Sequence, residues 1–410
     1  MAFESYPQLL DFFVTLGVTR AMFKPLAEND NSKQQIYLGG SFEALNELPF
    51  GEIRTENEAN RKNFKARVDL WWIDNDGETA PAPYAQLILY PRYPEVRLSG
   101  FLRGCTIAPS EDLRPVALPQ RTGTDGRFLI LGITGTNRIY AFLATRGSSI
   151  AASLVRANLN QQTTSGVFCK LPLPGVVDTK ALLLARLGGI SRAGWHRSHR
   201  LDRGGQIMEY RAPNGGGYTL EALLGIIPNG RSEPDFMGWE LKAFSKDKIT
   251  LMTPEPDGGY YERRGVEAFV RRYGHDAGNN TLYFTGVHKA NVPNMKTGMT
   301  LLLDGFDAET RRIINPSGGI ILDSSEGEVG ARWSFSRLLE HWGRKHSQAA
   351  YVKYTRQKCA GTFVYRYLNP VWLGEGTDFS TFLQAMSQGI VYYDPAPKVM
   401  NCNGIHSRVK

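Results

Sequence analysis

The hydrophobic pattern of the chain changes near residue 160, and this change divides it into two parts of different character. Upstream, an expected helix at residues 7–17 is followed by short alternating or apolar runs separated by Gly, Pro, Asn and Asp. Such runs are typical of a β-rich barrel or sandwich. Downstream, segments with helical spacing alternate with short apolar strands, which indicates an α/β or α+β arrangement. A length of 410 residues agrees with more than one hydrophobic core.

The region around residues 160–180 has the composition of a linker, since Gln, Thr, Gly and Pro replace the regular apolar pattern there. We therefore expect a β-rich domain over residues 1–165, a linker over residues 166–178 and a second domain over residues 179–410. The fold class predicted for the whole chain is α+β.

The net charge is confined to the second part of the chain. Residues 1–165 carry 17 basic and 17 acidic side chains, whereas residues 166–410 carry 31 and 23, so the whole net charge of +8 belongs to the C-terminal part. A basic field attracts polyanions through counterion release, which makes nucleic acid the first partner to consider. From charge alone, a basic enzyme with another substrate is an equal alternative.

Two further patterns concern location and redox state. No run approaches the roughly 20 apolar residues of a membrane span, and the first residues lack the basic flank and cleavage site of a signal peptide. We expect a cytoplasmic protein with no membrane association. Cys105, Cys169, Cys359 and Cys402 form no CxxC pair, so neither a zinc site nor a disulfide framework is indicated.

The segment PDFMGWELKAF places charged side chains within an apolar strand. Glu240 and Lys242 are two residues apart, so they project from one face of a strand, while Trp239 and Leu241 face a core. Asp235 arrives from the preceding turn. Two converging carboxylates bind a hard cation such as Mg²⁺, and a neighbouring lysine can orient an attacking water. The pattern indicates metal-dependent phosphodiester hydrolysis, although an ordinary exposed strand can carry the same residues by chance.

The run over residues 214–244 resembles the catalytic core of the MvaI/BcnI family of restriction endonucleases, which belongs to the MutH-like PD-(D/E)xK nucleases. The family motif is Asp, four residues, Glu, one residue and Lys, and it matches Asp235, Glu240 and Lys242. The resemblance implies that the two acids bind Mg²⁺, that Lys242 is the catalytic lysine, and that Glu221 is the acid of an upstream helix. It also implies an α/β restriction-endonuclease-like fold for the C-terminal domain.

The same resemblance implies a function. Enzymes of this family cut both strands of DNA at short CCNGG-type sites and act as monomers, and a cognate methyltransferase acting on the same site is a possible partner. Two alternatives stay open: a MutH-like endonuclease that nicks one strand during repair, and a non-catalytic DNA-binding protein that retains the fold. Cleavage of plasmid DNA by the protein alone would separate them.

The N-terminal part carries a second resemblance. Residues 17–42 and 87–105 are similar to the front segments of longer members of the family, and a β-rich pseudobarrel in this position resembles the EcoRII-like effector domain. That resemblance implies a Type IIE enzyme, in which a second copy of the DNA site stimulates cleavage. A domain that docks on the nuclease or binds another protein is the alternative.

Basic side chains in three regions are candidate contacts for DNA, because arginine and lysine neutralise phosphates and arginine also reads guanine. Solvated surface residues are the alternative in each region. The candidates are Arg54, Lys62, Lys65, Arg67, Arg92, Arg97 and Arg103 in the N-terminal part, His196 and Arg197 in a His- and Arg-rich segment, and His406 and Arg408 near the end.

Three other features receive structural interpretations. The glycine-rich segment at residues 212–219 has no following Lys-Ser/Thr, so a P-loop is disfavoured and a tight turn before the Glu221 helix is expected. Residues 335–346 form an expected amphipathic helix, either on DNA or on a plain surface. His341 and His346, like the other histidines of this part, show no metal-ligand spacing and are expected to be structural.

Overall fold

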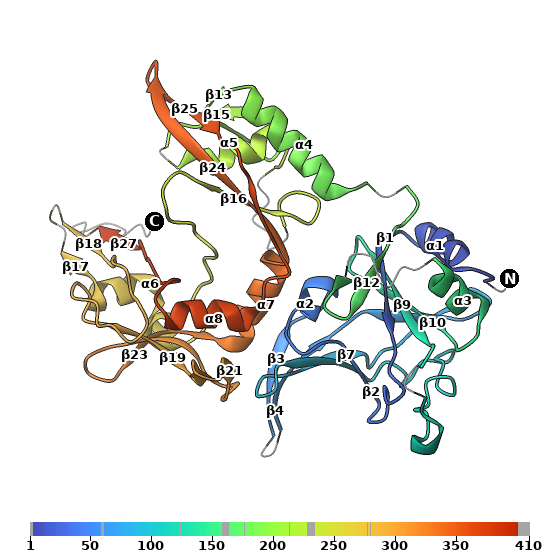
Figure 1. The fold of residues 1–410 in the computed structure, drawn as a ribbon. Helices are drawn as coiled ribbons and strands as arrows, with labels where there is room; N and C mark the ends of the chain where they lie inside the picture. The colour runs from blue at the N-terminus through green and yellow to red at the C-terminus, as the bar shows by residue number, and fades with distance from the viewer. Residues whose placement is uncertain are drawn as a thin grey trace.

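The computed structural model describes residues 3–58, 61–122, 125–157, 164–175, 177–212, 214–227, 234–276, 278 and 280–400. Figure 1 shows an N-terminal part built mainly from sheets, and a C-terminal part with two groups of elements. One group contains α4, α5 and the long strands β24 and β25, and the other contains α6, α8 and several short strands. The mixed α and β composition that the sequence predicts is confirmed.

The N-terminal part contains two sheets. A seven-stranded sheet has the order β11-β12-β1-β9-β10-β5-β6, and a five-stranded sheet has the order β2-β8-β7-β4-β3. The elements are α1 (Tyr6–Thr15), β1 (Val18–Pro25), β2 (Gln35–Tyr37), α2 (Ala44–Glu47), β3 (Ile53–Glu58), β4 (Arg61–Arg67), β5 (Leu70–Ile73), β6 (Thr79–Pro81), β7 (Gln86–Tyr90), β8 (Glu95–Ser99), the 3-10 helix η1 (Leu118–Gln120), β9 (Phe128–Thr134), β10 (Ile139–Ala144), α3 (Ser149–Arg156), β11 (Thr164–Ser165) and β12 (Phe168–Leu171).

The strands β9 and β10 form the centre of this part, and every residue in both is buried. Their sequences are continuous apolar runs because both faces of the sheet are covered at these strands. One face packs with α1 and α3, and the opposite face contributes to the core shared with the five-stranded sheet. The expected pseudobarrel is not confirmed, since the described strands form two sheets and no closed barrel.

The expected linker begins with a strand. β12 (Phe168–Leu171) pairs antiparallel with β1, in the register Ala21 opposite Leu171. Phe168, Cys169 and Leu171 are buried there. The short segment FCKL therefore belongs to the N-terminal sheet, although Gly and Pro surround it in the sequence.

The first group of the C-terminal part is built on a sheet with the order β13-β25-β24-β16, and β26 also pairs with β24. β16 runs parallel to β24, whereas β25 and β26 run antiparallel to it. Helices α4 and α5 contribute to the core under this sheet. The elements are α4 (Thr179–Arg192), β13 (Trp195–Arg197), β14 (His199–Leu201), β15 (Ile207–Glu209), α5 (Gly215–Leu223), β16 (Glu240–Phe244), β24 (Gln348–Cys359), β25 (Thr362–Tyr367) and β26 (Trp372–Glu375).

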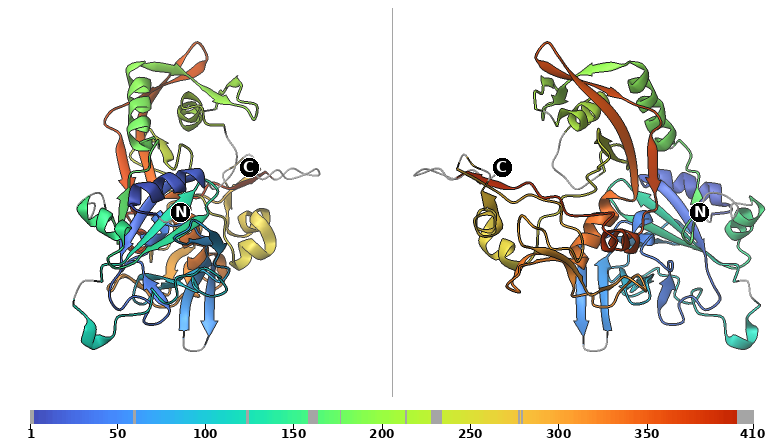
Figure 2. Two further views of the ribbon diagram at one scale, coloured as in Figure 1. Left: turned by 90° about the vertical axis from the view of Figure 1, so that its right-hand side faces the viewer. Right: turned by 60° about the vertical axis from the view of Figure 1, so that its left-hand side comes forward.

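The second group surrounds the three-stranded sheets β19-β22-β23 and β17-β18-β27. Figures 1 and 2 show the β24–β25 hairpin extending away from the N-terminal sheets. The elements of this group are α6 (Gly259–Tyr273), β17 (His275–Asp276), β18 (Thr281–Tyr283), β19 (Thr300–Asp304), β20 (Phe306–Asp307), β21 (Arg312–Ile313), β22 (Gly319–Asp323), β23 (Val329–Ser334), α7 (Phe335–Lys345), α8 (Phe379–Ser387) and β27 (Lys398–Met400). Among the described residues, no helix is long and apolar enough to cross a membrane.

The glycine-rich segment lies inside a helix and not in a turn before it. Gly215 and Gly216 begin α5 and are both buried. A Cβ at Gly216 would lie 2.3 Å from the ring of Tyr354, and one at Gly215 would lie 2.6 Å from the Ser198 hydroxyl oxygen. The glycines let α5 approach β24 and the residue that follows β13 closely, which fixes the helix that carries Glu221.

Helix α7 joins the N-terminal part to the C-terminal part. Its residue Glu340 is buried and accepts a 3.2 Å hydrogen bond from the backbone N–H of Ile53, which begins β3. Gly343 faces the Phe50 ring, where a Cβ would lie 2.9 Å from the nearest carbon. The expected amphipathic helix is therefore confirmed, because its apolar residues pack into the shared core. Contact of its basic face with DNA stays a prediction.

Candidate active site

The strand β16 presents its charged and apolar side chains in alternation. Trp239, just before the strand, and Leu241 are buried in the core with α4 and α5. Glu240 and Lys242 project from the other face, as the spacing predicts, and the Glu240 side chain is only 3% exposed. A carboxylate this deeply buried requires compensating charges or ligands.

A tight turn brings Asp235 next to the strand. Phe236 and Trp239 exchange backbone hydrogen bonds of 2.9 and 2.8 Å around Met237 and Gly238, which both have positive φ. The chain folds back at this turn, and Asp235 Oδ2 accepts a 2.8 Å hydrogen bond from the backbone N–H of Leu241. The four-residue spacing between the two acids is therefore the length that the turn requires.

Glu240 stands between two lysines. Its Oε1 lies 2.8 Å from Lys242 Nζ and 3.6 Å from Lys345 Nζ. Lys345 is the last residue of α7, so it reaches the site from a distant part of the sequence. Sequence analysis missed it, because a basic residue in the last turn of a helix is common and has no spacing relation to the motif.

The acids of the site affect one another. Burial, followed by the charges of Asp235 and Glu240, raises the pKa of Glu221 to about 7. Burial also raises the pKa of Asp235, against a lowering by the Leu241 N–H, and the Glu240 charge adds to the increase. Glu221 on α5 is therefore electrostatically linked to both motif acids. Three carboxyl groups and two lysines thus share one region.

Two histidines that the sequence indicates as structural lie beside this charged group. Burial and the positive charge of Lys242 lower the pKa of His346 to about 4, so its imidazole is neutral at pH 7. Its ring stacks on Trp342, with a centroid distance of 4.2 Å. Burial and the charges of Lys345 and Lys242 likewise lower the pKa of His341. No sequence signal distinguishes these two from the other histidines.

The donor set fits a hard divalent cation. Glu240 Oε2 is buried, and it makes no hydrogen bond with the residues that the structure describes. An unpartnered buried carboxylate oxygen beside the raised pKa of Asp235 indicates a site with excess negative charge, which a cation relieves. Within the same described ranges, no three His, Cys, Asp or Glu side chains are arranged as a complete metal cluster. For a Mg²⁺ ion held by these acids, water and phosphate oxygens would complete the coordination.

Most of the candidate DNA contacts in the N-terminal part are engaged within it. Ion pairs or ring contacts hold three of the arginines, and Lys65 pairs with Glu56 at 2.6 Å. Arg92 donates a 3.4 Å hydrogen bond to the carbonyl of Ile314, so it contacts the C-terminal part. The other pairs are Arg54 with Glu52, Arg97 with Glu95 and Arg103 over the ring of Tyr84. Lys62 and Arg67 are exposed on β4.

The remaining candidates differ in their positions. His196 Nε2 lies 2.9 Å from the Ile190 carbonyl, so this ring is tied to the end of α4. Arg197 is exposed on β13, in the same sheet as Glu240. His406 and Arg408 lie outside the described residues. None of the candidates in the N-terminal sheets is brought into the carboxylate group of β16.

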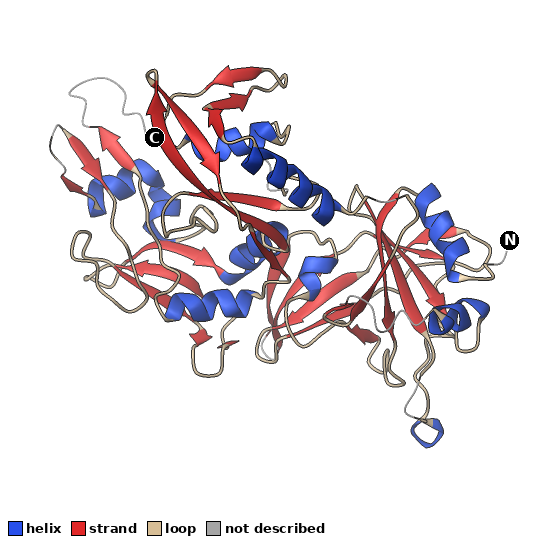
Figure 3. Ribbon diagram, turned by 45° about the horizontal axis from the view of Figure 1, so that its top comes forward, coloured by secondary structure: helices blue, strands red, loops and turns tan. Residues whose placement is uncertain are grey.

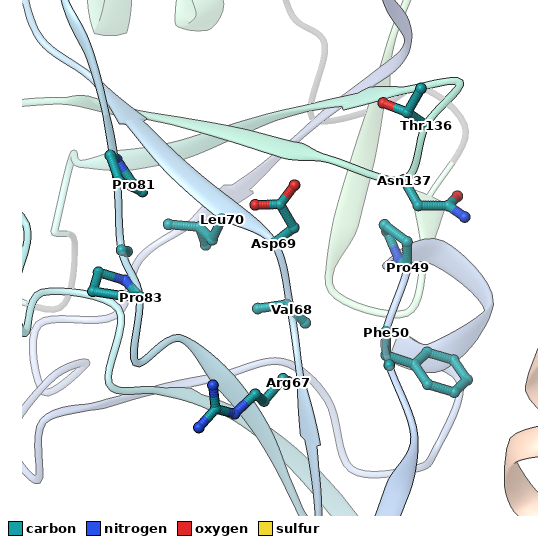
Figure 4. Close-up of a pocket in the computed structure, with 12 residues that line it drawn as sticks. Pro49, Phe50, Arg67, Val68, Asp69, Leu70, Pro81, Pro83, Thr136 and Asn137 are labelled. Carbon is teal, nitrogen blue, oxygen red and sulfur yellow. The ribbon is translucent and has the colours of Figure 1, made fainter.

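Two pockets lie in the N-terminal part, away from the carboxylates of β16. The larger, of about 440 Å³, is lined by Pro49, Phe50, Arg67, Asp69 and Asn137 among others, and Figure 4 shows these side chains around it. The Asp69 carboxylate in this pocket already accepts hydrogen bonds from Trp71 Nε1 at 2.8 Å and Arg138 Nε at 3.0 Å. This pocket therefore has no visible link to the chemistry of β16.

The fold and the site together define a class. Restriction-endonuclease-like nucleases typically combine a parallel strand pair with a tight turn before one of these strands. An Asp, Glu and Lys set lies at this turn and at the start of the strand. The model of the MvaI/BcnI restriction endonuclease family matches residues 184–408, which is more than half of the chain. The chain belongs to this family, and the protein is a site-specific deoxyribonuclease.

Two solved structures are similar to part of this chain. A complex of the MvaI restriction endonuclease with its cognate DNA is similar, with 20% sequence identity and a TM-score of 0.42, over 54% of this chain and 85% of that chain. MvaI without DNA is similar with 18% identity and a TM-score of 0.28, over 54% and 84%. No curated protein matches the sequence.

Proposed function

We propose that the protein is a Mg²⁺-dependent endonuclease that cuts both strands of DNA by hydrolysing phosphodiester bonds. The observation that carries the proposal is the arrangement around Glu240, whose Oε1 is held between two lysines while its Oε2 is buried without a hydrogen bond in the described residues. Such a carboxylate is fixed in position and still has a free oxygen for a cation.

Each side chain has a separate role in this proposal. Asp235 and Glu240 would hold Mg²⁺, and Leu241 N–H orients the Asp235 carboxylate for this purpose. Bound Mg²⁺ supplies Lewis-acid chemistry, since it polarises the phosphate and lowers the pKa of a bound water. Lys242 Nζ orients the attacking water and offsets charge on the phosphate. Lys345 Nζ, which lies 3.6 Å from the same Oε1, also holds Glu240 in place.

Glu221 is suited to move a proton. With a pKa of about 7, its carboxyl group is close to half ionised at neutral pH. Once positive charge enters the site, that pKa falls and the carboxylate form becomes available as a base. The role of a general base therefore belongs to Glu221 more readily than to His346, whose cationic form is disfavoured throughout the neutral range.

The finer parts of the function rest on the family. We expect a short CCNGG-type recognition site, a cytoplasmic monomer, and a methyltransferase that protects the same site. We also expect Type IIE behaviour, in which the N-terminal part binds a second copy of the site. The contact between Ile53 and Glu340 supports this last proposal, because α7 also carries Lys345 to Glu240.

Incubation of the purified protein with supercoiled plasmid and Mg²⁺ tests the proposal. We expect linear products, and mapping the ends on phage DNA should return one short site with 5′-phosphates. Accumulation of open circles alone would instead favour a MutH-like nicking enzyme that needs a partner. Plasmid that stays uncut with every divalent cation tested would contradict the hydrolytic function.

A further inference from the structure

Helices α4 and α5 cover one face of the catalytic sheet, whereas the other face is buried at its Glu240 end, where Lys345 of α7 reaches it. Residues Ala350, Val352 and Tyr354 of β24 are buried against the side chains of α4 and α5. The alternate residues of β24 point the other way, beginning with the buried Ala349 opposite Glu240 and continuing with Tyr351 opposite Lys242. Figure 3 shows the two helices lying along the sheet from β24 to β25.

Beyond the catalytic residues this face is more exposed, and most of its side chains are basic or aromatic. The register pairs Lys353 with Phe244, and Thr355 with Arg366. Arg366 is in turn opposite Trp195 of β13. These residues therefore form a continuous row on the face that carries Glu240 and Lys242. Trp372, opposite Tyr351, contacts the Phe244 ring at 5.9 Å.

These side chains are available to a partner. Trp195 is 44% exposed and Trp372 is 49% exposed, which is unusual for so large an apolar side chain. Arg366 is exposed, and it forms no ion pair with any residue that the structure describes. Lys353 Nζ lies 3.9 Å from the carboxylate of Asp247, which is itself fully exposed, so this pair is weak.

We infer that this face, formed by Lys353, Arg366 and Trp195, holds the DNA duplex on one side of the cleavage site. The inference rests on the proposed function of the carboxylate group. The charge is complementary to phosphate, and the face is continuous with the side chains that would contact the scissile bond. Figures 1 and 2 show the hairpin extending away from the N-terminal sheets.

The register also gives the distance of this contact from the catalytic lysine. Tyr351, opposite Lys242, and Thr355, opposite Arg366, are four residues apart on β24. At about 3.3 Å per residue, Arg366 lies about 13 Å along the strand from the level of Lys242. A duplex that follows the strand would meet Arg366 about four base pairs from the scissile phosphate.

A binding experiment in Ca²⁺ tests the inference. The probes are a duplex carrying the site mapped from wild-type cleavage, with long flanks, and the same duplex shortened to end within about four base pairs of the cut on either side. Arg366→Ala should weaken binding of the long duplex about threefold to tenfold and reduce the dependence of log K on log salt by about one unit. On the short duplex, the variant and the wild type should bind equally.

Arg186→Ala is the matched control, because Arg186 is exposed on α4, on the covered side of the sheet. It should leave both affinities unchanged. Equal binding of the long duplex by Arg366→Ala and wild type would overturn the inference, as would an equal loss in Arg186→Ala. Failure of the wild type to cut plasmid DNA would instead count against the proposed function, so the two failures are distinguishable.

Discussion

At the scale of single residues, the site combines a local motif with one distant lysine. Asp235, Glu240 and Lys242 are close in sequence, and a turn with two positive φ angles is sufficient to bring them together. This explains why the sequence alone predicts them. Lys345 reaches the same carboxylate because helix α7 packs beside the site. The spacing of residues within the motif cannot predict such a contact.

Lys345 provides the first prediction. Lys345→Ala should lower the cleavage rate about a hundredfold, because Glu240 loses one of the two positive charges that hold it. Binding of DNA in Ca²⁺ should change little. Single-turnover cleavage measures the effect, and Lys345→Arg should recover part of the rate. Full activity in Lys345→Ala would show that Lys242 alone positions Glu240.

Glu221 provides a prediction about stability without a divalent cation. Its pKa is raised from 4.5 to about 7, so the folded state binds a proton that the unfolded state releases. The resulting stability is present below pH 4.5 and is lost as the pH rises through about 7. Glu221→Gln should remove this part of the pH dependence, which corresponds to about 1 to 3 kcal/mol.

Thermal unfolding between pH 5 and pH 8 checks this prediction. One series is measured in metal-free buffers and a second series in Mg²⁺. Added Mg²⁺ should reduce the pH dependence of the wild type, because a cation compensates the charge of the carboxylates. Glu262→Gln, which alters an exposed glutamate on α6, is the control. An identical pH dependence in wild type and Glu221→Gln would contradict the assignment of a raised pKa.

At the scale of elements, α7 connects the two parts of the chain to the site. Its residue Glu340 accepts from Ile53 N–H and pairs with Arg344 at 3.0 Å, and its last residue is Lys345. A helix is stiff over three turns, so a displacement at β3 would be transmitted to Glu240. This arrangement is a physical route by which DNA bound to the N-terminal part could alter catalysis.

Substitution of Glu340 tests that route. Glu340→Ala leaves the buried Ile53 N–H without an acceptor, which should cost about 1 to 3 kcal/mol of stability. It should also reduce the stimulation of plasmid cleavage by a second duplex that carries the site. Glu340→Gln keeps an acceptor and should retain the stimulation. Equal stimulation in wild type and Glu340→Ala would separate α7 from the effector response.

The sequence predicts the individual elements better than their assembly. Alternating apolar patterns predict the strands of the N-terminal part, and helical spacing predicts α4, α5, α6 and α7. Whether sheets close into a barrel depends on long-range strand pairing, which the sequence patterns do not contain. The predicted pseudobarrel is not confirmed. β12 is missed because three apolar positions among Gly and Pro are too few to be periodic. The glycines of α5 are expected in a turn, but they lie in the helix because a larger side chain at Gly216 would collide with the ring of Tyr354. A sequence pattern does not contain this long-range contact.

At the scale of the whole molecule, the position of β12 defines where the chain can be divided. A C-terminal fragment that starts at residue 166 retains β12 without its partner β1, so its apolar side chains would be exposed. A fragment that starts at residue 177 omits the strand. We expect the second fragment to be the more soluble, with residual Mg²⁺-dependent cleavage that a second duplex no longer stimulates.

Both fragments should be less stable than the full chain, because the face of α7 that packs on Phe50 and Ile53 loses its cover. Sedimentation and thermal unfolding of the two fragments measure this. If the fragment from residue 166 were as soluble as the one from residue 177, the pairing of β12 with β1 would have no importance for folding.

The central claim is that Asp235 and Lys242 belong to a hydrolytic centre for DNA. The most direct test measures plasmid cleavage in Mg²⁺ and duplex binding in Ca²⁺ for Asp235→Ala and Lys242→Ala. The account predicts that both variants lose cleavage while they bind the duplex as tightly as the wild type within about threefold. Wild-type cleavage by either variant would contradict the assignment of the site.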